Sequence, residues 1–462
     1  MSRIPSISLA RRLGVYDAAL IVMGGIIGSG IFRNPSVVAA QIHTPMLAML
    51  EWVLGGVIAL VGAFLFAELA ARRPHDGGLY AYMRDAYHPI VAFMYGWTLL
   101  LVSQSGGMAA AALTFAGYFE PLTGLHVSEP LLAFTVLAIF TIVNCLGVRE
   151  GSTLQNVFMV LKIGAIVLLI GAGLFAHPVA AASLPASAQS NALAAMGVAL
   201  IPVLFAYSGW QTSSFMTAEL KEPQRTLPLG MIWGVVGVVV LYLLVNYVCL
   251  HVLGIRGLMS TDAPASDVMR AFMGPRGAQI IAAVIALSTL GFLSNQILTS
   301  PRVYHAMAED GSFFPQLAWV HPITRVPVIA IALQGFVAAI ITFWKGYAQI
   351  LNYVTSIDYT FFALSALALF IFRARDRAHN VAGPAFRIPL HPFSTALFLA
   401  IAVVTVGATY VSTFQSSGWN VLITPGILLI AIPIYYGFRS FTKGSLVATA
   451  PETGLSERLP GN

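Results

Sequence analysis

The sequence predicts an all-α integral membrane protein with twelve transmembrane helices, of which the first and the sixth are interrupted near mid-membrane. The 462 residues are 58% hydrophobic and only 9% charged, whereas a soluble domain carries about 25% charged residues. Apolar runs of nearly 20 residues recur along the whole chain, and such a run spans a hydrocarbon core of about 30 Å. Two of these runs carry glycine and small polar residues near their centres. These observations exclude a water-soluble fold.

The apolar runs are continuous rather than alternating, which favours helices over the strands of a β-barrel. We expect one transmembrane domain over 1–462, with repeats at about 13–176 and 193–372, two further helices at about 393–440, and short tails. The first run has no small-residue cleavage signature and is interpreted as retained. The predicted spans are 15–40, 46–71, 88–118, 130–148, 153–176, 193–218, 228–254, 278–308, 327–344, 349–372, 393–413 and 420–438.

The basic residues gather on one side of the predicted membrane. With an even number of spans, eighteen Lys and Arg residues share a side with the N-terminus, five lie on the other side, and Lys162 lies within a span. The positive-inside rule then places both termini in the cytoplasm of a protein in the plasma membrane. The net charge of +6 therefore reflects topology in a lipid bilayer, and we expect no nucleic acid partner. The eighteen are Arg3, Arg11, Arg12, Arg72, Arg73, Arg84, Arg149, Lys221, Arg225, Arg302, Arg325, Arg373, Arg375, Arg377, Arg387, Arg439, Lys443 and Arg458.

The first span contains the segment IVMGGIIGSGIF, residues 21–32, in which Gly28, Ser29 and Gly30 follow each other. These three residues lie 13–15 positions into the span, about 20 Å deep at 1.5 Å per residue. Gly24 and Gly28 also form a GxxxG pattern, which packs helices together in membranes. The additional glycine and the tight Gly-Ser-Gly favour a local break over packing alone.

The sixth span contains a second interruption, PVLFAYSGWQTSSF, residues 202–215. The two interruptions begin two blocks of five spans, and an odd number of spans makes the second block enter the membrane from the opposite face. Paired breaks at corresponding positions of two halves indicate the substrate site of a secondary transporter. Unwound backbone survives in lipid only where it lines a cavity. Amides after Gly28 can hold a carboxylate, and carbonyls from Phe205 to Ser208 can accept from an ammonium.

Lys162 lies about 16 Å into the fifth span, and an intramembrane lysine of this depth is rarely without a role. Its side chain reaches only about 6 Å, too short to extend to the membrane interface. It either bonds carbonyls of the first break and the hydroxyls of Ser288 or Thr289, or it loses its proton. A fixed ammonium suggests a substitute for a sodium ion, and a titrating amine suggests proton coupling. The deepest acidic residue is Asp358 in the tenth span.

Other polar residues in the spans are interpreted either as contacts between helices or as substrate contacts. Tyr242 and Asn246 share a helix face, and Phe205 and Trp210 flank the second break. Two short polar runs, Ser103-Gln104-Ser105 and Ser294-Asn295-Gln296, stand in the third and eighth spans.

The sequence has no convergent acid, base or nucleophile set and no phosphate-binding loop. We therefore expect no enzyme activity, no cofactor and no metal. The two cysteines, Cys145 and Cys249, lie in apolar spans, so we expect no disulfide and no covalently linked heavy subunit.

Four segments carry a resemblance to a known family. They are GGIIGSGIF, FAELAARRPHDGGLYAYMRDAY, FAYSGWQTSSFMTAELKEPQRTLPLG and LTSPRVYHAMAEDGSFFPQLAWVHP. Over residues 13–440 the chain resembles the amino acid–polyamine–organocation (APC) superfamily, and within it the bacterial relatives of L-type amino acid transporters. The resemblance implies the LeuT-like 5+5 inverted-repeat fold and a place in a bacterial inner membrane.

The resemblance also implies roles for individual residues. The family's substrate carboxylate motif corresponds to Gly28, Ser29 and Gly30 with Ile27 alongside, and its sixth-span gate to Phe205. The carbonyls that hold the amino group correspond to Phe205, Ala206 and Ser208, next to Gly209. Lys162 and Tyr242 correspond to the family's fifth-span lysine and seventh-span tyrosine, and Ser288 is a further candidate for coupling. Ser208 replaces a glycine that is usual in eukaryotic members.

The sequence thus predicts a sodium-independent transporter of neutral L-amino acids, a permease or antiporter that works by alternating access as an exchanger. The prediction assumes a pocket without charged side chains. Three alternatives remain: proton-coupled symport with Lys162 titrating, transport of cationic amino acids or polyamines, and a sensor or channel on a transporter fold.

Overall fold

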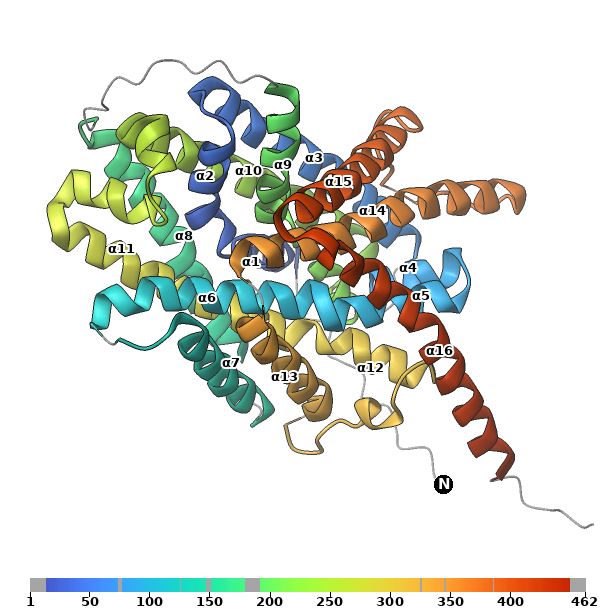
Figure 1. Ribbon diagram of the computed structural model, residues 1–462. Helices are drawn as coiled ribbons and strands as arrows, with labels where there is room; N and C mark the ends of the chain where they lie inside the picture. The colour runs from blue at the N-terminus through green and yellow to red at the C-terminus, as the bar shows by residue number, and fades with distance from the viewer. Residues whose placement is uncertain are drawn as a thin grey trace, which may run out of the picture.

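The computed structural model describes residues 14–73, 77–124, 126–146, 151–178, 192–324, 326–344, 346–384 and 386–448. These residues form helices and no β-strand. Figure 1 shows the helices packed around a central group, with α16 (Ile423–Ala448) projecting from the bundle. The two tails, on which the predicted cytoplasmic placement of the termini depends, lie outside the described residues.

Each predicted apolar run is helical in the structure. Several helices begin with proline at the first helical position, where the missing N–H has no helical partner to lose. Seven described helical stretches are long and apolar enough to span a membrane, or eight if the bent pair α1 and α2 is counted. The twelve-span count and the inverted repeat remain predictions. The helices are α1 (Val15–Ile26), α2 (Gly30–Gln41), α3 (Pro45–Arg72), α4 (Leu79–Ala86), α5 (Pro89–Thr98), η1 (Leu99–Ser103), α6 (Gln104–Thr123), α7 (Glu129–Cys145), α8 (Gly151–Phe175), α9 (Ala192–Tyr207), η2 (Trp210–Glu219), α10 (Pro223–Met259), α11 (Pro264–Thr299), α12 (Pro301–Glu309), η3 (Pro315–Ala318), α13 (Val328–Trp344), α14 (Tyr347–Ala378), α15 (Phe393–Ser417), η4 (Gly418–Leu422) and α16.

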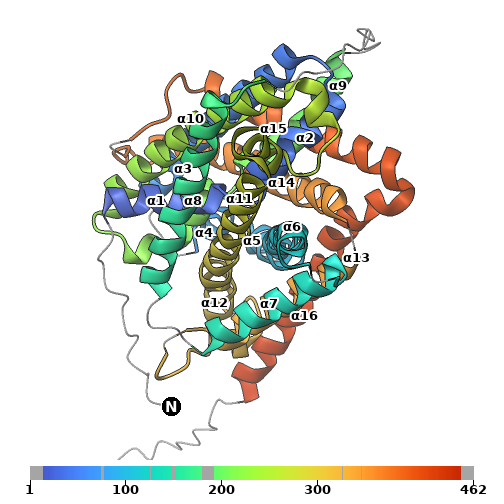
Figure 2. The same ribbon diagram turned by 90° about the vertical axis from the view of Figure 1, so that its left-hand side faces the viewer.

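The two interrupted segments pack against each other in opposite directions. Helix α1 contacts η2 and helix α2 contacts α9, so the first half of each segment lies beside the second half of the other. Further contacts join α3 with α10, α6 with α11, and α7 with α13. Figure 2 shows α6 almost end-on beside α11. Elements from the two predicted repeats are therefore interleaved around the centre of the bundle.

A buried cluster of ion pairs joins α3 to α14 at the ends that are predicted to face the cytoplasm. Glu68 is fully buried and accepts hydrogen bonds from Arg373 Nε at 2.9 Å and Arg373 Nη2 at 2.6 Å. It also accepts from Arg72 Nε at 2.8 Å and from the backbone N–H of Ile388 at 2.7 Å. Asp376 pairs with Arg72 on its other side. The cluster therefore ties these ends of the two helices to the segment before α15.

Candidate functional site

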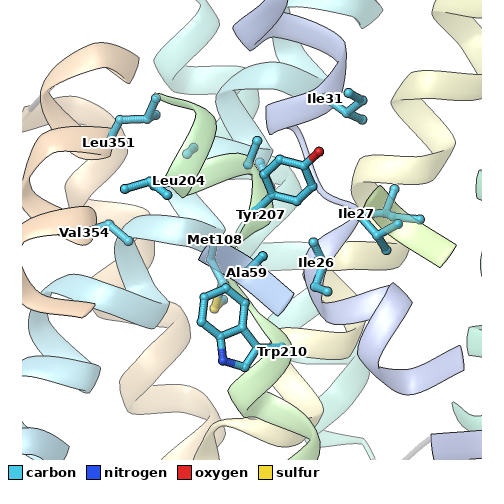
Figure 3. Packing of buried hydrophobic residues seen from close by; sticks show 14 of the residues in the cluster. Ile26, Ile27, Ile31, Ala59, Met108, Leu204, Tyr207, Trp210, Leu351 and Val354 are labelled. Atoms are coloured by element: carbon cyan, nitrogen blue, oxygen red, sulfur yellow. The ribbon is translucent and has the colours of Figure 1, made fainter. Parts of the chain in front are cut away.

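The first helix is interrupted where the glycine-rich segment predicts it. Helix α1 ends at Ile26, Ile27 has an extended backbone with φ −70° and ψ 93°, and α2 begins at Gly30 with Ser29 as its N-cap. The two halves are bent by 44°. Figure 3 shows the ribbon reduced to a thin trace between Ile27 and Ile31. The break thus places the N-terminus of α2 inside the protein, where the first N–H groups of a helix have no i−4 partner; among them, Phe32 N donates to Ser29 O at 3.2 Å.

The second interruption lies directly against the first. Helix α9 ends at Tyr207 and η2 begins at Trp210, with Gly209 between them at φ +117°. A Cβ atom on Gly209 would lie 2.2 Å from the main-chain oxygen of Gly25, and a Cβ on Gly30 would lie 2.8 Å from Ala206 Cα. Glycine is required at these positions because two backbones approach each other and one adopts a left-handed conformation.

Both interruptions line a single cavity at the centre of the bundle. Of the eight residues that the sequence predicts to bind substrate, seven line this cavity: three from the first break and four from the second. The eighth, Ile27, does not line it. Phe205 is half-buried, as a residue beside a cavity can be. The structure therefore brings together the predicted site residues Gly28, Ser29, Gly30, Phe205, Ala206, Ser208 and Gly209.

Some backbone groups around the cavity are already engaged. Phe205 O accepts from the backbone N–H of Ser208 at 3.1 Å, and the Ser208 hydroxyl donates to Leu204 O at 2.8 Å. A carbonyl oxygen has two lone pairs, so the Phe205 carbonyl retains one acceptor position. The hydroxyl of Ser208 is occupied by its own helix.

Lys162 of α8 contacts the backbone of the first break. Its Nζ donates to Ile27 O at 2.6 Å and to Gly24 O at 3.4 Å, and the residue is 2% exposed. The Nζ atom also lies 5.8 Å from the centre of the Phe292 ring, and Phe292 is part of the cavity wall. Lys162 is thus joined to the carbonyls of the first break, one of its two predicted sets of partners.

The predicted hydroxyl partners of Lys162 are not joined to it. Ser288 Oγ has no hydrogen-bond partner among the described residues, and Thr289 Oγ1 donates to Ala286 O at 2.8 Å. Tyr242, by contrast, donates from its hydroxyl to Ile26 O at 3.2 Å. The main-chain oxygens at the end of α1 are therefore held by an amine from α8 and a phenol from α10.

The polar run in the third span contributes to the cavity through a π-helical turn. Residues Leu99–Ser103 form this turn between α5 and α6, and such turns are often found at functional sites. Ser105 Oγ donates to Leu100 O at 2.5 Å, five residues earlier. Ser103 and Gln104 consequently face the cavity. From the sequence alone, these two residues could serve either as contacts between helices or as contacts to the substrate.

The cavity also contains a charged side chain, so the expectation of a site without one is wrong. Asp358 of α14 lines the cavity and is 7% exposed. Its Oδ1 accepts from Ser103 Oγ at 2.5 Å. Its depth in the tenth span was visible in the sequence, but no periodicity indicated that α14 would turn it toward the two breaks.

A second polar pair completes this wall. Gln296 Nε2 donates to Gln104 Oε1 at 2.5 Å, and Ser300 Oγ donates to the same oxygen at 2.8 Å. Gln296 Oε1 is buried and has no hydrogen-bond partner among the described residues. The wall opposite the breaks thus presents acceptor oxygens rather than a purely apolar surface.

Comparison with known proteins agrees with this geometry. The family model described as "Amino acid permease" matches residues 13–435. The chain is 28% identical over 438 residues to the serine/threonine exchanger SteT of Bacillus subtilis, which covers 93% of this chain and 97% of that protein. It is 27% identical to the human b(0,+)-type amino acid transporter 1, covering 98% of this chain and 94% of the relative.

A third relative is the human large neutral amino acids transporter small subunit 2. It is 27% identical to this chain, and the alignment covers 93% of this chain and 81% of the relative. The family match over nearly the whole chain, together with two broken helices around one cavity, leads to one conclusion. This chain is a membrane protein of the amino acid permease family within the APC superfamily.

Proposed function

We propose that this protein exchanges L-amino acids, neutral ones included, across the plasma membrane by alternating access and without sodium. The observation that carries the proposal is the single cavity lined by Gly28–Gly30 of the first break and by Phe205–Gly209 of the second. Discontinuous helices at matching positions are the usual substrate sites of secondary transporters. The names of the relatives above, an exchanger and amino acid transporters, support the same class of substrate.

The backbone supplies recognition of the invariant part of an amino acid. The N-terminal end of α2, with its partial positive charge, attracts the α-carboxylate. Carbonyl oxygens between Phe205 and Ser208 accept from the α-ammonium. Phe205 is the proposed gate, since its partly exposed ring can close over the substrate. The interleaved packing of the two repeats supports a bundle in which one half moves against the other.

Sodium independence rests on the contacts of Lys162. Sodium is held in this type of transporter by carbonyl oxygens of unwound backbone. Here the Lys162 ammonium bonds two such oxygens, those of Gly24 and Ile27. A fixed positive charge in this place makes an ion unnecessary. The rival proposal is that Lys162 loses its proton during the cycle, which would make the protein a proton-coupled symporter.

The proposed protein works without a covalently linked heavy subunit. Its two cysteines belong to α7 and α10, and Cys249 is buried. A disulfide to a separate chain needs an exposed thiol outside the lipid.

The test is uptake of labelled amino acids into proteoliposomes containing the purified protein. We expect uptake only into vesicles preloaded with amino acid, equal in sodium and in potassium buffer. Uptake into empty vesicles that follows an imposed pH gradient would instead establish proton symport. If none of the twenty amino acids drives counterflow while the protein remains monodisperse, amino acid exchange is ruled out.

A further inference from the structure

We propose that Asp358 forms a side-chain subsite that favours amino acids with a cationic side chain over neutral ones of the same length. The inference rests on the proposed function, because it assumes that the α-carboxylate and α-ammonium are held at the two breaks. It adds a specificity-determining residue that backbone recognition of the zwitterion does not require.

The subsite faces the breaks across the cavity. Val354 and Asp358 are four residues apart on α14, so they share a helix face, and both line the cavity. Figure 3 shows Val354 on the opposite side of the packed centre from Ile26, the last residue of α1, and from Ile27 of the first break. A substrate whose α-carbon lies at the breaks therefore extends its side chain toward α14 and the π-helical turn.

The carboxyl group of Asp358 is buried without a basic partner. Within the described residues its one hydrogen bond is the 2.5 Å contact from Ser103 Oγ to Oδ1, and no ion pair involves it. A buried charge is costly unless it is paired. The intramembrane lysine does not supply this pairing, since Lys162 donates to the main-chain oxygens of Gly24 and Ile27.

A second acceptor lies in the same wall. Gln296 Oε1 accepts no hydrogen bond from the part of the chain that the structure describes, although the amide nitrogen of Gln296 donates to Gln104 Oε1. An ammonium has three donors and a guanidinium has five. Asp358 and Gln296 together offer oxygens that either group can use.

The net charge of the occupied site also favours a cationic side chain over a neutral one. A neutral amino acid leaves the Asp358 carboxylate uncompensated in a low-dielectric cavity, whereas a lysine or ornithine side chain neutralises it. Hydrogen bonds between charged groups are stronger than those to neutral ones. We therefore expect a preference of about ten- to hundredfold for the cationic side chain.

The experiment compares lysine with norleucine, which has the same chain length without the ε-amine. In proteoliposomes, each amino acid is tested for its ability to inhibit counterflow of a labelled substrate. In a separate thermal-shift assay, each is added to the detergent-purified protein. In the native protein lysine should compete at about ten- to hundredfold lower concentration than norleucine. Equal competition, or better competition by norleucine, would overturn the inference.

The variant Asp358→Asn removes the charge and keeps the shape and an acceptor for Ser103. It should lose the lysine preference, so that lysine and norleucine compete at similar concentrations. The matched control is Glu51→Gln, a second buried carboxyl, 1% exposed, that belongs to α3 and not to the cavity wall. It should keep the lysine preference.

Failure of the inference and failure of the proposed function give different results. If norleucine or serine is exchanged but lysine is not, the function stands and the Asp358 subsite is wrong. If no amino acid is exchanged or stabilises the protein, both are wrong. Should Asp358→Asn not fold, the lysine and norleucine comparison in the native protein decides the question by itself.

Discussion

Lys162 Nζ and the main-chain oxygen of Ile27 are 2.6 Å apart, and this contact joins the middle of α8 to the end of α1. Tyr242 reaches the neighbouring oxygen of Ile26 from α10. Carbonyls left without helical partners in lipid need donors, and two side chains from distant spans provide them. The interruption of the first helix is therefore stabilised by tertiary contacts that its own sequence does not contain.

The first prediction concerns the Lys162 amine. Lys162→Met keeps an apolar side chain and removes the ammonium group, so the carbonyl oxygens of Gly24 and Ile27 lose their hydrogen-bond donor. We expect counterflow to fall at least about tenfold, consistent with the loss of a charged hydrogen bond. The control is Lys221→Met, since the side chain of Lys221 is exposed. Normal exchange by the first variant would show that the ammonium is dispensable.

The second prediction concerns space at the first break. A Cβ on Gly30 would lie 2.8 Å from the Cα and Cβ of Ala206, so Gly30→Val pushes the two breaks apart and distorts the proposed carboxylate site. We expect the variant to lose substrate binding in a thermal-shift assay. Gly164→Ala in α8 is the control, because a Cβ there meets no atom within 4 Å. Native affinity in a folded Gly30→Val protein would refute the proposed site.

The third prediction concerns the backbone at the second break. Gly209→Ala introduces a side chain at φ +117° and places its Cβ 2.2 Å from Gly25 O. Strained backbone of this kind costs about 2 kcal/mol before any steric overlap is counted. Thermal denaturation in detergent should show a clear loss of stability. An unchanged melting temperature would mean that the two backbones are not in contact.

The fourth prediction concerns the ion-pair cluster between α3 and α14. Glu68→Gln leaves Arg72 and Arg373 facing a neutral amide, and breaking a buried pair costs about 3 kcal/mol. Glu309→Gln removes a carboxylate with 64% side-chain exposure from its contact with His305, which should cost less than about 1 kcal/mol. Chemical denaturation of both variants measures the difference. Equal losses would contradict the structural importance of the buried cluster.

Much of the fold could be predicted from local patterns. The composition and the length of the apolar runs indicate membrane helices, and the clusters at Gly28–Gly30 and Ser208–Gly209 identify both interruptions, since few other residues permit such close approach or positive φ. The count of twelve spans and the inverted repeat rest on the same pattern. They remain predictions, supported by the antiparallel packing of the two broken segments.

The polar wall of the cavity could not be predicted in the same way. Asp358 and Gln296 belong to long helices that carry further polar residues at several positions, so the sequence does not single out the face that turns inward. From the sequence, the partners of Lys162 could be either backbone carbonyls or hydroxyl groups. In the structure its ammonium donates hydrogen bonds to the carbonyl oxygens of Gly24 and Ile27.

Lipid thickness and backbone geometry act on contiguous residues, so the membrane location, the helical class and the positions of both breaks follow from local sequence. The contacts at the centre of the bundle, Asp358 with Ser103 and Lys162 with Ile27, follow from the fold instead. Helix rotation and the choice of neighbours depend on packing among segments far apart in the chain, and in apolar helices that packing leaves little trace in local periodicity.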